Sequence, residues 1–139
     1  MSSTDTGNST QPESSPGCSF CYENIKSKII AEYNSAYAIN DKFPVSKGHV
    51  LIIPKRHTED FFSMAIHERR DAEQLLLDMK KDIAEHDPCI TGFNIGINCG
   101  ESAGQTIFHA HIHLIPRRDR DTPNPRGGVR GVIPDKMSY

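Results

Sequence analysis

The sequence predicts an α+β domain: a mostly antiparallel, five-stranded sheet carrying one long and one short helix. Short apolar runs bounded by turn residues occur on both sides of a single long segment with helical periodicity, 66–86. The last of these runs, 106–115, alternates histidine with apolar residues. With 139 residues, the chain has the length of one domain with a real core.

The predicted strands are 28–33, 36–40, 49–53, 92–98 and 106–115. The first two are separated by Asn34-Ser35, which is typical of a hairpin turn. Pro54 ends the third strand because proline cannot donate a hydrogen bond to a ladder. Asp87-Pro88 closes the segment before the fourth strand.

Between the third and fourth strands, the pattern predicts both helices. Thr58, followed by Glu59 and Asp60, has the pattern of an N-cap with acidic residues in the first turn, which predicts a short helix. The long helix, 66–86, has apolar residues at helical spacing on one face, namely Ala72, Leu76, Met79 and Ile83. We expect that face to cover the sheet.

Composition sets the organisation of the chain and limits its partners. The first segment, 1–17, is rich in Ser, Thr and Pro and is expected to be a disordered tail, while 18–116 is the predicted domain and 117–139 an Arg/Gly/Pro-rich arm. A net charge of −2 gives no general attraction to nucleic acid or anionic membranes. No run approaches the roughly 20 apolar residues that span a bilayer, so a cytoplasmic protein is expected.

The alternating run near the end of the domain carries the chemistry. Successive strand residues point to opposite faces, so His109, His111 and His113 share one face. The opposite face carries apolar side chains, namely Phe108, Ala110, Ile112 and Leu114. Three imidazoles in register can act as nucleophile, proton donor or metal ligand near neutral pH.

The run 104–115 resembles the signature of the histidine triad (HIT) family, in which three histidines alternate with apolar residues. The resemblance extends to Gln105, Asn98 and the upstream strand 47–54. It implies a HIT fold and a nucleotide hydrolase or transferase. His111 would attack an α-phosphorus and form a nucleotidyl-histidine that water resolves, a route that divides one difficult displacement into two.

The resemblance also implies roles for the residues around His111. His113 would stabilise charge on the phosphate, His109 would belong to the same catalytic group, and His49 would orient His111, although His49 could instead be a structural strand-start histidine. The residues expected to bind the nucleotide are Asn98, Gln105, Thr106, Asp41, Phe20 and Ile39. From sequence alone, Asp41 could be a turn residue, and Phe20 and Ile39 could be core.

A second motif predicts a metal. Some HIT branches bind zinc through a Cys-x-x-Cys pair, a histidine of a Pro-x-x-His segment and the first triad histidine, which here are Cys18, Cys21, His57 and His109. Two thiolates and two imidazoles leave no open position, so this zinc would be structural. The alternatives are a redox pair, which lacks a thioredoxin-like context, and two unpartnered thiols.

The sequence therefore favours a HIT hydrolase that acts on a purine nucleoside phosphoramidate or a dinucleoside polyphosphate without a catalytic metal. Two alternatives remain: a hydrolase whose His-x-His-x-His strand binds catalytic zinc, and a non-catalytic nucleotide-binding module. The resemblance implies a homodimer. The arginines of 117–139 could hold distal phosphates, or the arm could be a flexible or dimer-contacting segment.

Overall fold

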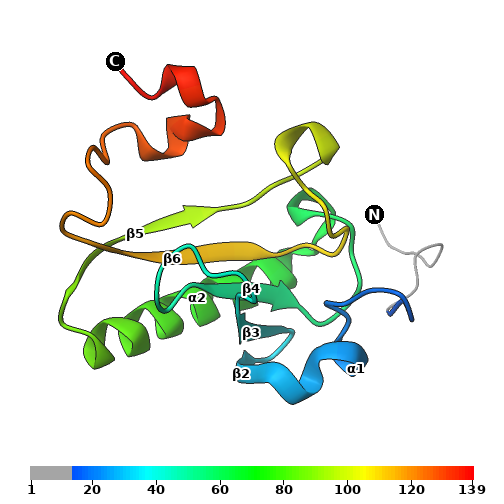
Figure 1. The fold of residues 1–139 in the computed structure, drawn as a ribbon. Coiled ribbons are helices and arrows are strands. Elements are labelled where there is room, and N and C mark those ends of the chain that lie inside the picture. Colours follow the sequence, from blue (N-terminus) through cyan, green and yellow to red (C-terminus); the bar gives the residue numbers. More distant parts are fainter. Residues whose placement is uncertain (1–13) are drawn as a thin grey trace.

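The computed structural model describes residues 14–139, so most of the predicted tail, 1–17, lies outside the described part. Its sheet has the order β2-β3-β4-β6-β5, with antiparallel neighbours throughout. The strands are β2 (Ile29–Tyr33), β3 (Ala36–Asn40), β4 (Val50–Pro54), β5 (Ile90–Gly96) and β6 (Ile112–Arg118), and the α-helices are α1 (Tyr22–Ile25) and α2 (Ile66–His86). The predicted α+β fold is confirmed (Figure 1).

The two faces of the sheet have different coverings. Helix α2 packs along one face, where Leu75 and Met79 contact alternate residues of the central strands such as Ile52 and Leu114. The other face carries a smaller apolar cluster that includes Phe20 and joins the residues that point away from α2, namely Tyr37, Ile39, Leu51 and Ile53. This second face is therefore only partly covered.

The hairpin and the long helix lie where the sequence predicted them. Asn34 adopts a left-handed conformation (φ 49°) in the β2–β3 turn, which asparagine tolerates. The start of α2 is fixed by Glu68, a buried carboxylate that accepts hydrogen bonds from the Ala65 N–H and the Arg56 guanidinium. Burial raises the pKa of Glu68, but these bonds and the Arg56 charge outweigh burial and leave it below its usual value.

The predicted short helix after Thr58 is wrong in place and kind. The structure has a three-residue 3₁₀ turn, Phe61–Ser63, capped by Asp60, whose side chain accepts from the Ser63 N–H. The Thr58 hydroxyl is buried and bonds the Ser63 hydroxyl instead. The short α-helix is α1, which directly follows Cys21.

The histidine strand begins later than predicted: β6 starts at Ile112, so His109 and His111 precede it. The β4–β6 register pairs Ile52 with Ile112, and its continuation would bring Ala110 opposite Pro54, which has no N–H to donate. The Pro54 carbonyl bonds the His109 ring instead, and the Ala110 N–H donates to the Thr58 carbonyl. The side chains nevertheless alternate between the two faces of the sheet: Ala110 and Ile112 face α2, while His111 faces the other side.

The C-terminal segment, 119–139, lies on the β5 side of the sheet, away from β2 (Figure 1). It contains two 3₁₀ turns, Gly128–Val132 and Pro134–Lys136. The Arg126 and Arg130 guanidinium groups lie 4.7 and 5.0 Å from the ring centre of Tyr139. Across residues 14–139, no helix combines the length and the apolar character needed to cross a membrane.

Candidate functional site

A cavity of about 980 Å³ opens on the face of the sheet that α2 does not cover. Seven of the residues that the sequence predicted for the site line it, namely Phe20, Ile39, Asp41, Asn98, Thr106, His111 and His113. They come from the segment before α1, from the end of β3, from the loop after β5 and from the start of β6. Residues far apart in the chain thus meet around one histidine.

His111 is held in one tautomer. Its Nδ1 lies 2.8 Å from the His109 carbonyl oxygen, which can only accept, so Nδ1 carries the proton and Nε2 keeps its lone pair. Burial lowers the pKa of His111, although the bond to the His109 carbonyl and the Asp41 charge raise it in part. The Phe20 ring meets the His111 ring edge-on at 5.0 Å and restricts its position.

Behind the cavity, a hydrogen-bonded chain fixes the tautomer of His113. The Val45 N–H donates to Nδ1 of His49 (3.0 Å), so a neutral His49 carries its proton on Nε2. That Nε2 lies 2.9 Å from Nδ1 of His113 and 3.3 Å from an Asp41 carboxylate oxygen. Nδ1 of His113 is therefore an acceptor, and the proton of a neutral His113 is on Nε2.

Burial lowers the pKa of His49, while the charge of Asp41 partly raises it. Burial also lowers the pKa of His113, as do the neighbouring rings of His111 and His49. Both rings are therefore neutral at pH 7, as the hydrogen-bonded chain requires. His49 was expected to orient His111, but the ring that it contacts in this chain is His113.

The loop after β5 is shaped by two glycines with positive φ, Gly100 (95°) and Gly104 (92°). Gln105 is buried behind this loop. Its carbonyl accepts from the Gly100 N–H, and its amide donates to the carbonyls of Glu59 and Ile107. Both amide hydrogens are used, so the side chain fixes the loop and does not provide the phosphate contact that was expected.

Some residues that line the cavity were not predicted from the sequence. Lys28 and Lys42 line the cavity together with Phe43. Isolated surface lysines carry no recognisable pattern, although Lys42 adjoins Asp41 in the sequence. The Val45 N–H, which fixes the His49 tautomer, is a backbone group and leaves no signal in the sequence at all.

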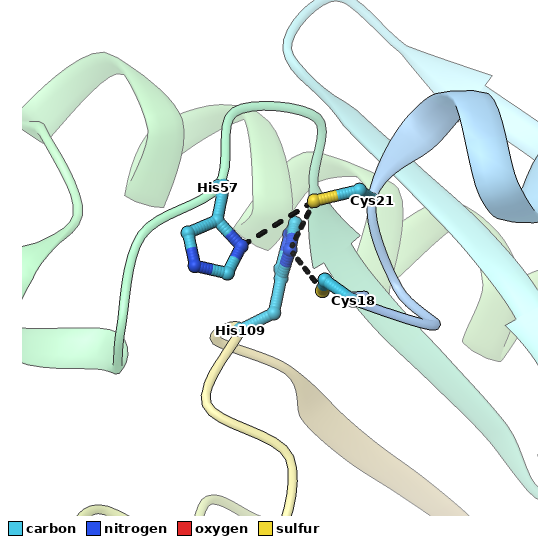
Figure 2. Close-up of side chains that lie close together, drawn as sticks. All are labelled: Cys18, Cys21, His57 and His109. Carbon is cyan, nitrogen blue, oxygen red and sulfur yellow. Dashed lines mark hydrogen bonds between the residues drawn. The ribbon is translucent and has the colours of Figure 1, made fainter. Parts of the chain in front are cut away.

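A second cluster of side chains joins the N-terminal segment to His109, which precedes β6. Cys18, Cys21, His57 and His109 point toward one another (Figure 2), and their ligand atoms all lie within 4.8 Å of one another. Sγ of Cys21 is 3.3 Å from Nδ1 of His57, and Sγ of Cys18 is 3.4 Å from Nδ1 of His109. Since Nε2 of His109 is 2.7 Å from the Pro54 carbonyl and must carry the proton, Nδ1 has the lone pair that a metal needs.

The donor set fits zinc. Ligand atoms of a tetrahedral zinc site with bonds of 2.0–2.3 Å lie about 3.3–3.8 Å apart, close to these distances. Burial raises the pKa of Cys21 to about 11, and the Ser15 N–H lies 3.1 Å from its Sγ, a donor that suits a thiolate. A buried thiol of this kind ionises at neutral pH only when a cation compensates its charge.

The triad does not form a single metal site. His109 belongs to the cysteine cluster, whereas His113 belongs to a separate group with Asp41 and His49. His111 belongs to neither group and bonds a backbone carbonyl. The alternative of a catalytic zinc held jointly by His109, His111 and His113 therefore does not fit the geometry.

Comparisons with known proteins agree with this architecture. Residues 22–120 match the HIT domain family. An uncharacterised 16.1 kDa HIT-like protein of Mycoplasma pneumoniae is 35% identical over 104 residues, which cover 72% of this chain and 71% of that protein. Adenylylsulfatase HINT3 of Arabidopsis thaliana is 37% identical over 93 residues, 65% of this chain but only 45% of HINT3.

Solved structures of HIT and histidine triad proteins also resemble this chain. A HIT family protein from Bacillus anthracis superposes with a TM-score of 0.69 at 33% identity, covering 77% of each chain. A Zn-bound histidine triad family protein from Mycobacterium smegmatis gives 0.68 at 29% identity, over 84% of this chain and 90% of that one. A histidine triad nucleotide-binding protein from Candida albicans gives 0.66 at 30%, over 74% and 76%.

Proposed function

Because this chain belongs to the HIT family, we propose that it binds a purine nucleotide in the cavity beside His111 and cleaves the phosphoramidate or phosphoanhydride bond at its α-phosphorus. The observation that carries the proposal is the tautomer of His111. A neutral imidazole with its proton on Nδ1 and its lone pair on Nε2 is a nitrogen nucleophile at neutral pH.

The chemistry has two steps. Nε2 of His111 bonds to phosphorus as the bond from phosphorus to the leaving group breaks, and water then attacks phosphorus as the bond to Nε2 breaks. Overall, the hydroxyl of water ends on phosphorus and a proton ends on the leaving atom. His113, with its proton on Nε2, is placed to donate a hydrogen bond to a phosphate oxygen and to stabilise developing charge.

The remaining cavity residues suit a nucleoside. Asp41 is fixed by the Phe43 N–H and by His49, and its remaining lone pairs can accept the ribose hydroxyls. Phe20 and Ile39 provide apolar walls for the base. Asn98 and Thr106 lie on the side of the glycine loop, where they can donate to the phosphate.

Zinc completes the proposal. We infer a structural ion held by Cys18, Cys21, His57 and His109, supported by the donor set and by the Zn-bound relative from M. smegmatis. When bound, the ion neutralises two thiolates and holds the N-terminal segment against the residues that precede β6. Four protein ligands leave no position for substrate, so the proposed reaction uses no catalytic metal.

Turnover of a nucleoside 5′-phosphoramidate tests the function directly. We expect the purified protein to release the nucleoside monophosphate, with no loss of rate in the first minutes after a chelator is added while the fold persists. Chromatography of the products measures it. Nucleotide binding without any release would favour the non-catalytic module, and immediate loss of the rate in intact protein would favour a catalytic metal.

The pH profile should follow the histidine tautomers. Because burial holds the pKa of His111 below the ordinary value of about 6.5, the nucleophile is neutral at pH 7 and becomes protonated only as the pH falls below 6.5. We therefore expect kcat/KM to be level from pH 8 to about 6.5 and to fall at lower pH. Initial rates corrected for acid hydrolysis of the substrate measure this, and an acidic limb centred above pH 7 would contradict it.

The exposed edge of the sheet supports a homodimer. Strand β5 lies at the edge of the sheet. Its Ile95 lines a shallow cleft together with Ile66 of α2, and both side chains are more than half exposed. An unpaired edge beside apolar residues is suited to a second copy of the chain. Light scattering should give a dimer for the natural protein and a monomer for Ile95→Asp, and a monomeric natural protein at tens of micromolar would refute the proposal.

A further inference from the structure

A second cavity, of about 620 Å³, lies beside the first one on the same face of the sheet. Ile115 and Arg117 line it, and they follow His113 at every second residue of β6, so all three point to that face. Asn98 lines both cavities. The other wall is the C-terminal segment, which contributes Val129, Val132 and Met137.

The arginines of β6, of which Arg117 lines this cavity, are already engaged. Arg117 donates to both carboxylate oxygens of Asp121 and to the side-chain oxygen of Asn94. Arg118 is paired with Asp87. A chain of phosphates would have to displace these partners, so the arginines of β6 are poorly placed to hold the distal part of a dinucleoside polyphosphate.

Arg126 and Arg130 of the C-terminal segment are engaged as well. Arg126 and Arg130 both lie over the Tyr139 ring, and Arg130 also donates to the Lys136 carbonyl. These contacts hold the segment together. The side chains that the segment turns toward the cavity include Val129 and Val132, which are 69% and 78% exposed in the structure. They offer apolar surface to a ligand rather than charge.

We propose that this second cavity is the leaving-group subsite, and that it takes an uncharged, partly apolar group. The inference rests on the proposed function. With the nucleoside between Phe20, Ile39 and Asp41, and the reacting phosphate near His111 and Asn98, the leaving group extends past His113 along β6 and under the C-terminal segment.

For a phosphoramidate of an apolar primary amine, the bond that breaks is P–N. The amine nitrogen keeps the electron pair and gains a proton, and the nucleotidyl group passes first to His111 and then to the oxygen of water. Apolar contacts of the amine with Val129, Val132 and Ile115 would raise kcat/KM for such substrates over unsubstituted phosphoramidate.

The test compares three substrates: unsubstituted adenosine 5′-phosphoramidate, its N-phenethyl derivative and diadenosine tetraphosphate. We expect the natural protein to prefer the phenethyl compound. In Val132→Asp, the ratio of kcat/KM for the phenethyl compound to that for the unsubstituted one should fall about tenfold, because a carboxylate opposes the apolar group. Ile133→Asp is the matched control, since Ile133 is exposed on the same segment but does not line the cavity, and it should keep the ratio within about twofold.

An unchanged ratio in Val132→Asp and in Val129→Asp, or a preference for diadenosine tetraphosphate, would overturn the subsite while leaving the hydrolase proposal intact. Should none of the three substrates be turned over, the proposed function fails. Calorimetric titration of the phenethyl compound into the natural protein and into both aspartate variants then decides the subsite: weaker binding in these variants supports it, and equal binding overturns it.

Discussion

Replacing His111 with asparagine is expected to lower kcat for a nucleoside phosphoramidate by on the order of 10⁴-fold or more, because an amide has no nucleophilic nitrogen that could form the covalent intermediate. Nucleotide affinity should change little, since asparagine is similar in polarity and smaller. Single-turnover reactions with a substrate labelled at the α-phosphate measure both the rate and the acid-labile nucleotidyl adduct, which should be absent in the variant.

His86→Asn provides the matched control, because His86 is an exposed histidine at the end of α2 and does not line the cavity. It should retain full activity and a normal amount of adduct. A His111→Asn protein that remained fully active would remove the covalent mechanism, whereas an adduct that persisted would assign the nucleophile to another residue.

Loss of the cysteine cluster should have the largest effect on stability. Cys21→Ser removes a buried ligand next to Nδ1 of His57 and His109, and we expect the zinc content to fall from about one per chain to near zero. Without the ion, buried polar groups lose their common partner, so the free energy of unfolding should drop by at least about 3 kcal/mol. That loss corresponds to a decrease in Tm of about 10 °C.

Elemental analysis and thermal unfolding measure the two effects on protein purified without a chelator. Cys89→Ser controls for the loss of a thiol, because Cys89 is exposed and lies outside the cluster. It should keep both the zinc and the Tm. Natural protein that contains no metal yet has the same Tm as Cys21→Ser would dismiss the structural ion.

Local patterns predicted the elements whose causes are local. The periodicity of 66–86 gives helix α2 with the same bounds, and Asn34-Ser35 gives the β2–β3 turn. The short helix was misplaced because the acidic residues after Thr58 are compatible with any tight turn, and only the bond of Asp60 to the Ser63 N–H decides which turn forms. Helix α1 follows Cys21 and consists of four residues, too few for a periodic signal.

In the candidate site, too, the sequence predicted some features and not others. The residue types and spacing indicated His111, His113 and the cysteine pair. The contacts of the other groups were not accessible from sequence: His49 contacts His113 and Gln105 fixes the loop, whereas the place of His109 beside the cysteines is the one that the family resemblance implied. These contacts join residues 46 to 91 positions apart, except for Gln105 and its own loop.

The sequence by itself determined the alternation that separates the apolar side of the last strand from its histidines, because side-chain direction along an extended chain follows from backbone geometry alone. Only the tertiary structure decided which group each histidine ring contacts. The β4–β6 register stops the ladder at Pro54, which turns His109 toward the cysteines and gives its carbonyl to Nδ1 of His111. The protonation of a ring depends on the partner of its other nitrogen, and that partner is supplied by distant parts of the chain.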